Sequence, residues 1–232
     1  MTLDRFLLPA TLVLSAIATL PAGRLDAQGD PDRPVTGGGT LPGDWHAQTD
    51  WSMRTNQAPA LENVKFAVMG RGYHVTTGPA AIFWRDADTA FGSYHVVASI
   101  AQTRNPEHPE AYGIFIGGRD LAGGGQAYTY FLIRAYDGKF SVRRRAGQRT
   151  RPTAVVDWTA HDAVTKADAA TGRAENELSI LVQGGQVKFL INGKEVHSAS
   201  AVDLDTRGIV GYRVNHNLDV QLGALGIHPM GG

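Results

Sequence analysis

Cysteine is absent from the sequence. The chain therefore has no disulfide framework, no thiol chemistry and no lipid attachment through an N-terminal cysteine. Packing alone must supply the stability of any domain that the chain forms.

An excess of charge of one sign is also lacking, because 22 Lys and Arg residues balance 22 Asp and Glu residues. Such a chain has no global field that would attract nucleic acid or an anionic membrane. The one basic cluster, residues 143–145, is split between two faces, because side chains alternate along a strand. We therefore expect no nucleic-acid partner.

Long hydrophobic runs are missing except near the start, where residues 6–20 are apolar and follow Arg5. This run is shorter than the ~20 residues that a membrane span needs, and small residues follow it. The pattern predicts a signal peptide over residues 1–27, cleaved after Ala22 or Ala27. The mature protein would then have no membrane span and would be extracytoplasmic, either periplasmic or secreted. An uncleaved anchor or a buried helix is the alternative.

Glycine, in contrast, is abundant, with 28 residues in a chain of 232. Residues 28–43 combine Gly, Pro, Asp and Thr without an apolar period, which indicates a flexible leader. From residue 44 to residue 232, short apolar runs are separated by glycine and proline. This second part is expected to form one domain of strands joined by tight turns.

The domain shows strand patterns and almost no helical ones. Asp137-Gly138 and Asn192-Gly193 each stand between two alternating runs, which predicts two-residue hairpin turns. About ten to twelve strands are more than one open sheet holds, so the pattern predicts two packed antiparallel sheets. The expected strands lie in 65–69, 73–76, 80–84, 94–102, 112–116, 128–145 as a hairpin, 177–197 as three strands, 208–214 and 218–228.

The predicted hairpin divides its side chains between two faces. Pairing outward from Asp137-Gly138 places Leu132 opposite Arg143 and sets the core face. That face consists of Phe131, Ile133, Phe140 and Val142, while the opposite, exposed face includes Tyr128, Tyr130, Arg134 and Arg143. Aromatic rings beside the guanidinium groups of arginine, which donate several hydrogen bonds, suit a polyhydroxylated ligand. An ordinary solvent-facing strand surface is the alternative.

A second group of candidate ligand-binding residues stands near the end of the chain. Arg213 precedes the turn Asn215-His216-Asn217, which separates two predicted strands. His216 is the one candidate catalytic residue, because an imidazole can act as a base at neutral pH. A turn selected only for its asparagines is the alternative.

Several short phrases resemble one fold family. They are YGIFI at 112–116, YFLIR at 130–134, DGKF at 137–140, NEL at 176–178, FLING at 189–193 and GIVGY at 208–212. Together they resemble the concanavalin A-like lectin/glucanase superfamily over residues 64–228. Within it the chain looks most like bacterial laminin-G-like domains and the "domain of unknown function 1080" group, some members of which are named 3-keto-disaccharide hydrolases. The resemblance implies an all-β, two-sheet antiparallel jelly-roll sandwich.

The resemblance implies two alternative functions. The first is an exported, non-catalytic, lectin-like domain that binds a glycan or another polyhydroxylated ligand. The second is an enzyme acting on 3-keto-glycosides, in which His216 removes the C2 proton and Arg134 or Arg213 stabilises the enolate. A purely structural envelope protein is a third possibility.

The sequence lacks the signatures of two other kinds of site, a retaining-glycosidase active site and a histidine metal site. The sequence lacks the Glu-x-Asp-x-x-Glu spacing with which retaining glycosidases of this fold place their carboxylates. No histidine spacing specifies a metal, so we expect no metal site and no cofactor. Calcium held by loop carboxylates is the open alternative. The aspartates available for it are Asp86, Asp88, Asp120, Asp203 and Asp205.

Overall fold

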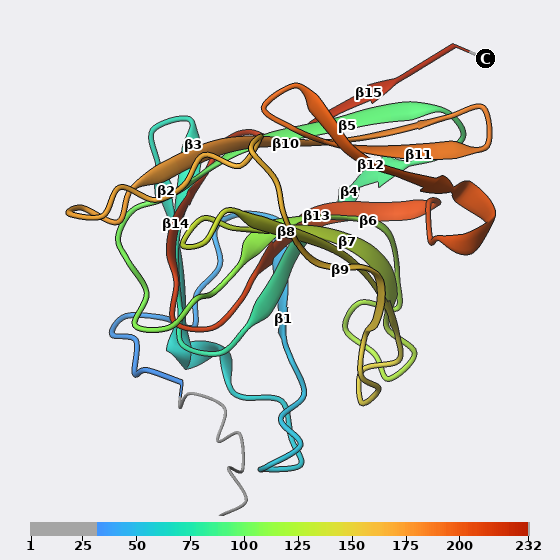
Figure 1. Cartoon of the computed structure of the whole chain (residues 1–232). Coiled ribbons are helices and arrows are strands. Elements are labelled where there is room, and N and C mark those ends of the chain that lie inside the picture. The colour runs from blue at the N-terminus through green and yellow to red at the C-terminus, as the bar shows by residue number, and fades with distance from the viewer. Residues whose placement is uncertain (1–31, 232) are drawn as a thin grey trace, which may run out of the picture. The chain divides into compact units, whose positions relative to one another are not determined.

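The computed structural model describes residues 32–231. In that range fifteen strands form two antiparallel sheets, and the chain also contains two short 3-10 helices. Figure 1 shows β10, β5 and β11 of one sheet above β6, β7 and β8 of the other. The predicted all-β architecture of two packed antiparallel sheets is confirmed. The predicted signal peptide, residues 1–27, lies outside the described residues.

Sheet 1 has seven strands, in the order β1-β4-β13-β6-β7-β8-β9. Their bounds are β1 (Trp45–Thr49), β4 (Ala81–Ala90), β13 (Gly208–Val214), β6 (Tyr112–Arg119), β7 (Ala127–Arg134), β8 (Lys139–Ala146) and β9 (Thr153–Ala160). The edge strands β1 and β9 were not predicted. Most residues of β9 are exposed, so it lacks the apolar alternation that marks a half-buried strand.

Sheet 2 has the order β12-β11-β10-β5-β14-β3-β2, and β15 pairs with β5. Its bounds are β12 (Lys194–Ser200), β11 (Gln186–Ile191), β10 (Ala174–Gln183), β5 (Tyr94–Gln102), β14 (Asp219–Leu222), β3 (Gly72–Thr77), β2 (Val64–Met69) and β15 (Gly226–Pro229). The 3-10 helices are η1 (Leu61–Asn63) and η2 (Ala201–Asp203).

The predicted strand over residues 218–228 is two strands. Both β14 and β15 pair with β5, but β14 pairs with residues 100–102 and β15 with residues 94–97. The chain leaves the sheet between them at residues 223–225, so an apolar-rich run in the sequence does not mean one continuous ladder.

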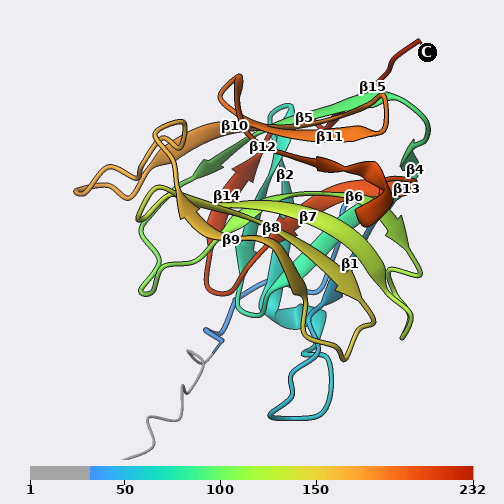
Figure 2. The same cartoon turned by 45° about the vertical axis from the view of Figure 1, so that its right-hand side comes forward.

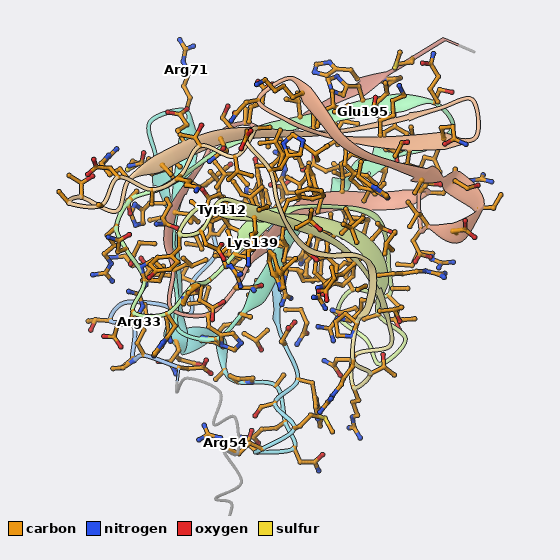
Figure 3. The ribbon with its side chains drawn as sticks, viewed as in Figure 1. Arg33, Arg54, Arg71, Tyr112, Lys139 and Glu195 are labelled. Carbon is orange, nitrogen blue, oxygen red and sulfur yellow. The ribbon has the colours of Figure 1, made fainter. Side chains whose placement is uncertain are left out.

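The main core lies between the two sheets and consists of the alternating apolar residues of their facing sides. Tyr112 and Phe131 of sheet 1 and Phe189 of sheet 2 are fully buried there, and the rings of Phe131 and Phe189 are 5.3 Å apart. Figure 3 shows Tyr112 inside the sandwich, whereas Arg54 and Arg71 extend outward. Aromatic packing of this kind stabilises the sandwich without any disulfide.

The Asn192-Gly193 turn is as predicted, with positive φ at both residues, 50° and 76°. The turn at Asp137-Gly138 is longer than predicted. Arg134 pairs with Lys139, so residues 135–138 form the turn, and only Gly138 has a positive φ. Leu132 lies opposite Ser141 rather than Arg143. Because this shift is two residues, every side chain keeps its predicted face.

Part of the predicted leader contacts the sandwich. The guanidinium of Arg33 donates hydrogen bonds to the carbonyl oxygens of Thr77 and Leu218 and forms a 2.7 Å salt bridge with Asp219. Leu41 packs against the main core. These contacts tie the described residues before β1 to one end of the sheets. No helix in residues 32–231 has both the length and the apolar character to cross a membrane.

Candidate functional site

The outer face of sheet 1, on the side away from sheet 2, carries a second hydrophobic cluster. An exposed face of an antiparallel sheet is usually polar, so buried apolar residues there mark an unusual surface. The cluster consists of Ile82, Trp84, Ala111, Phe115, Leu121, Tyr128, Tyr130 and Leu132, with Trp158 and Ile209 packed against it. Figure 2 shows β7, β8 and β9 side by side in the sheet that presents this face.

An ion cluster, which we call the Asp50 centre, lies on this face and comprises the buried Arg145 and Arg213 and the partly exposed Asp50, whose side chain is 22% exposed. Both carboxylate oxygens of Asp50 accept hydrogen bonds of 2.6 Å from the guanidinium of Arg213 on β13. Arg145 on β8 donates a third, of 3.0 Å. One carboxylate from the segment after β1 therefore joins two arginines on strands that are not neighbours.

The electrostatics of the Asp50 centre hold it ionised. Burial raises the pKa of Asp50, but the guanidiniums of Arg213 and Arg145 outweigh burial and lower this pKa from 3.8 to about 2. The pKa of Arg213 is in turn well above its usual value because of Asp50. The pair is thus charged across the whole neutral range.

Tyr128 and Tyr130 stand beside this centre. The hydroxyl of Tyr128 is 3.5 Å from Arg213 Nη1, and the Arg213 guanidinium lies 5.6 Å from the ring centre of Tyr130. Burial raises the pKa of Tyr130 to about 12, so its phenol stays protonated. Both tyrosines face away from the main core, as predicted.

The expectation that these two tyrosines are exposed is wrong. Tyr128 is fully buried and Tyr130 is 3% exposed. They pack in one cluster with Phe115 and Leu121, and the arginines of the Asp50 centre lie against them. Strand alternation predicts the face of a side chain, but it does not predict what lies over that face.

The turn after β13 adds Asn215 and His216. Asn215 Oδ1 accepts a 3.2 Å hydrogen bond from Arg213 Nε. His216 Nδ1 is 2.7 Å from Asp32 Oδ1, and its charge contributes to the low pKa of Asp50. The structure therefore brings His216, Asn215 and Arg213 together at one end of the Asp50 centre.

Arg134 and Arg143 belong to a different group, the Trp158 patch, which also includes Asp137 and Asp157. The guanidinium carbon of Arg134 is 4.6 Å from the ring centre of Trp158, and that of Arg143 is 5.8 Å away. Two carboxylates hold these arginines, because Asp137 pairs with Arg134 at 2.6 Å and Asp157 with Arg143 at 2.9 Å. Hence Arg134 does not lie at the Asp50 centre.

The seven predicted ligand-binding residues therefore divide between two adjoining sites. The Asp50 centre and its surroundings contain Tyr128, Tyr130, Arg213, Asn215 and His216, while the Trp158 patch contains Arg134 and Arg143. Their binding roles stay predictions. Sequence reasoning missed Asp50 and Asp32. Neither residue belongs to a motif or to an alternating apolar run that would have singled it out.

Two of the five rim aspartates considered for calcium, Asp88 and Asp205, pair with arginines. Asp88 pairs with Arg85 at 2.8 Å. Asp205 pairs with Arg119 at 2.5 Å and with Arg144 at 2.7 Å. No group of three His, Cys, Asp or Glu within residues 32–231 is placed to hold a metal ion. The calcium alternative gains no support from these contacts.

Comparison with known proteins gives structural matches only. No family model and no curated protein matches the sequence. A carbohydrate-binding module from Bacillus subtilis, CBM66, matches with a TM-score of 0.55 at 11% identity, over 82% of this chain and 99% of that chain. A Bacillus subtilis protein with a galectin-like fold matches with a TM-score of 0.56 at 13% identity, over 80% and 89%.

A third match extends the same fold to a glycoside hydrolase. It is a GH16 protein from Bacteroides ovatus, with a TM-score of 0.52 at 10% identity, over 79% of this chain and 94% of that chain. At these identities the matches establish architecture. They confirm that the described domain has the fold of a two-sheet antiparallel jelly-roll sandwich.

Proposed function

We propose that this protein binds a glycan on the outer face of sheet 1, at the Trp158 patch. The observation that carries the proposal is the partly exposed indole of Trp158, with two guanidiniums at its ring and a carboxylate beside each guanidinium. We place this binding outside the cytoplasm, because residues 6–20 predict a cleaved signal peptide.

The chemistry of the patch suits sugars. A sugar ring has apolar C–H faces that pack on an indole, and its hydroxyls both donate and accept hydrogen bonds. Arg134 and Arg143 supply donors, while Asp137 and Asp157 supply acceptors. Each of these side chains is already held in an ion pair, so less conformational freedom is lost when a ligand binds.

The carboxylates of this face favour binding over acid catalysis of hydrolysis. A general acid in a glycosidase needs a raised pKa so that it carries a proton at neutral pH. Asp50 has a pKa of about 2. The pKa of Asp137 is also lowered, because hydrogen bonding and charge from Arg134 outweigh burial.

The structural matches support the proposal without deciding it. Proteins of the same fold include a carbohydrate-binding module and a GH16 protein in complex with a G4G4G3G product. The fold can therefore present a glycan-binding surface, and the Trp158 patch offers suitable side chains for one.

Replacement of Trp158 with Ala should lower glycan affinity by at least about tenfold, because an aromatic ring that the bound ligand covers carries a large share of binding energy. A glycan array followed by calorimetry with the best ligand would measure this effect. Phe91→Ala is the matched control, since Phe91 is an exposed aromatic, 59% exposed, in the turn between β4 and β5. Equal affinity of Trp158→Ala and the wild type would refute binding at this patch.

One observation favours a second candidate function, an enzyme that acts on 3-keto-glycosides. Arg213 pairs with Asp50 and donates a hydrogen bond to Asn215, the residue before His216, so a base and a cationic group lie near each other. Asp32 engages His216 Nδ1, which leaves Nε2 to take a proton from a substrate. Arg213 could stabilise the resulting enolate, whereas Arg134 lies in the Trp158 patch.

His216→Gln should then reduce cleavage of a 3-keto-glycoside by about 10²-fold or more, the usual contribution of a general base. Release of the aglycone measures the rate, and His197→Gln on β12 serves as the control histidine. Full activity in His216→Gln, or no cleavage by the wild type, would contradict this second function.

A further inference from the structure

Two histidines that are far apart in the sequence face each other on sheet 2. His95 on β5 is the direct partner of His228 on β15 in the antiparallel ladder. Their ring centres are 6.2 Å apart and their planes are inclined by 38°. Their neighbours Val96 and Ile227 pack into the main core, so both imidazoles point to the outer face of sheet 2.

A thioether lies on the same face. Met230 follows β15, and its backbone N–H donates a 2.9 Å hydrogen bond to the carbonyl oxygen of Ser93, which continues the ladder by two residues. Side chains two residues apart in extended chain share a face, so Met230 is on the side of His228. Met230 is 36% exposed.

These donors are open to a ligand. His228 is exposed and His95 is partly exposed. Within residues 32–231, neither imidazole has a salt bridge to a carboxylate. The two imidazoles are thus not occupied by the ion pairs that hold His46, His74 and His216.

We infer that His95, His228 and Met230 form a copper-binding site on the outer face of sheet 2. An imidazole nitrogen binds a metal at about 2 Å, which places two rings on one ion about 5–6 Å apart between centres. The observed 6.2 Å lies close to this range, so the two rings are near enough to share one ion once a nitrogen of each turns towards it.

The donor set selects copper. Among divalent first-row ions, affinity for nitrogen ligands peaks at Cu²⁺, and a thioether is a soft ligand that favours Cu⁺. Calcium and magnesium prefer carboxylate and carbonyl oxygens, and this trio offers no carboxylate. The site is separate from the outer face of sheet 1 and does not depend on the glycan proposal.

Titration of the untagged full chain with Cu²⁺ tests the imidazole pair. Calorimetry should show binding that weakens at least about tenfold in His95→Gln and in His228→Gln, since even outer-shell changes cost about 10–100-fold in metal affinity. His46→Gln, on the outer face of sheet 1, is the matched control and should bind like the wild type. Unchanged Cu²⁺ stoichiometry and affinity in the double variant His95→Gln/His228→Gln would overturn the site.

A second titration tests the thioether. With Cu⁺ kept reduced and buffered by a competing chelator, Met230→Leu should bind about tenfold more weakly, while its Cu²⁺ affinity stays near that of the wild type. Melting temperatures of all variants should match the wild type, because the three side chains lie outside the core. Wild-type Cu⁺ affinity in Met230→Leu would overturn the assignment of the thioether as a ligand.

Discussion

Replacing Asp50 with Ala should lower the free energy of unfolding by about 3–5 kcal/mol, the usual cost of removing one partner from a buried ion pair. The reason is that Arg213 and Arg145, each about 5% exposed, would be left without their shared carboxylate. Chemical denaturation at neutral pH, followed by fluorescence, would measure the loss.

Asp157→Ala is the matched control for this prediction. Asp157 also pairs with an arginine, Arg143, but its side chain is 80% exposed. Exposed ion pairs contribute about 0–1 kcal/mol, so the control should stay close to the wild type. If both variants lost the same free energy of unfolding, the Asp50 centre would stabilise the fold no more than an exposed ion pair does.

The Asp50 centre also predicts that the free energy of unfolding depends on pH. A carboxyl whose folded-state pKa is depressed stabilises the fold above its unfolded value and loses that contribution as the pH falls. For Asp50 this contribution is lost between about pH 3.8 and about pH 2. The stability difference between the wild type and Asp50→Asn should therefore shrink as the pH falls through this range, and a constant difference would contradict the assigned charge.

Gly113→Ala should cost about 3 kcal/mol of unfolding free energy, at the upper end of the usual range for overpacking. Gly113 lies on β6, directly opposite Leu132 of β7 in the centre of sheet 1. A Cβ there would overlap the carbonyl oxygen of Phe131, a backbone atom that cannot swing aside as a flexible side chain can. The two strands would have to separate under the hydrophobic cluster of the outer face.

Gly124→Ala is the control, because a Cβ at Gly124 would meet no atom within 4 Å and its φ is not positive. Thermal and chemical denaturation of both variants would separate steric overlap from a general effect of losing a glycine. A Gly113→Ala protein as stable as Gly124→Ala would show that β6 and β7 can move apart at little cost.

The sequence alone was sufficient to predict the all-β sandwich and the division of the 128–145 hairpin between two faces. The register prediction was wrong by two residues, yet Tyr128, Tyr130 and Phe131 lie on the expected faces. Strand side chains alternate with a period of two, so an even shift leaves every face unchanged. The Asn192-Gly193 turn was equally predictable, because positive φ at two successive residues is a local preference.

Tertiary structure alone decided that Asp50 joins the arginines of its centre and that His95 and His228 meet. Asp50 joins Arg145 and Arg213, which are 95 and 163 residues away along the chain, and no periodic pattern marks it. His95 meets His228 only because β15 returns to pair with β5. Local stereochemistry and alternation determine turns and faces, whereas the burial of Tyr130 and the meeting of distant charges depend on how the sheets and loops pack.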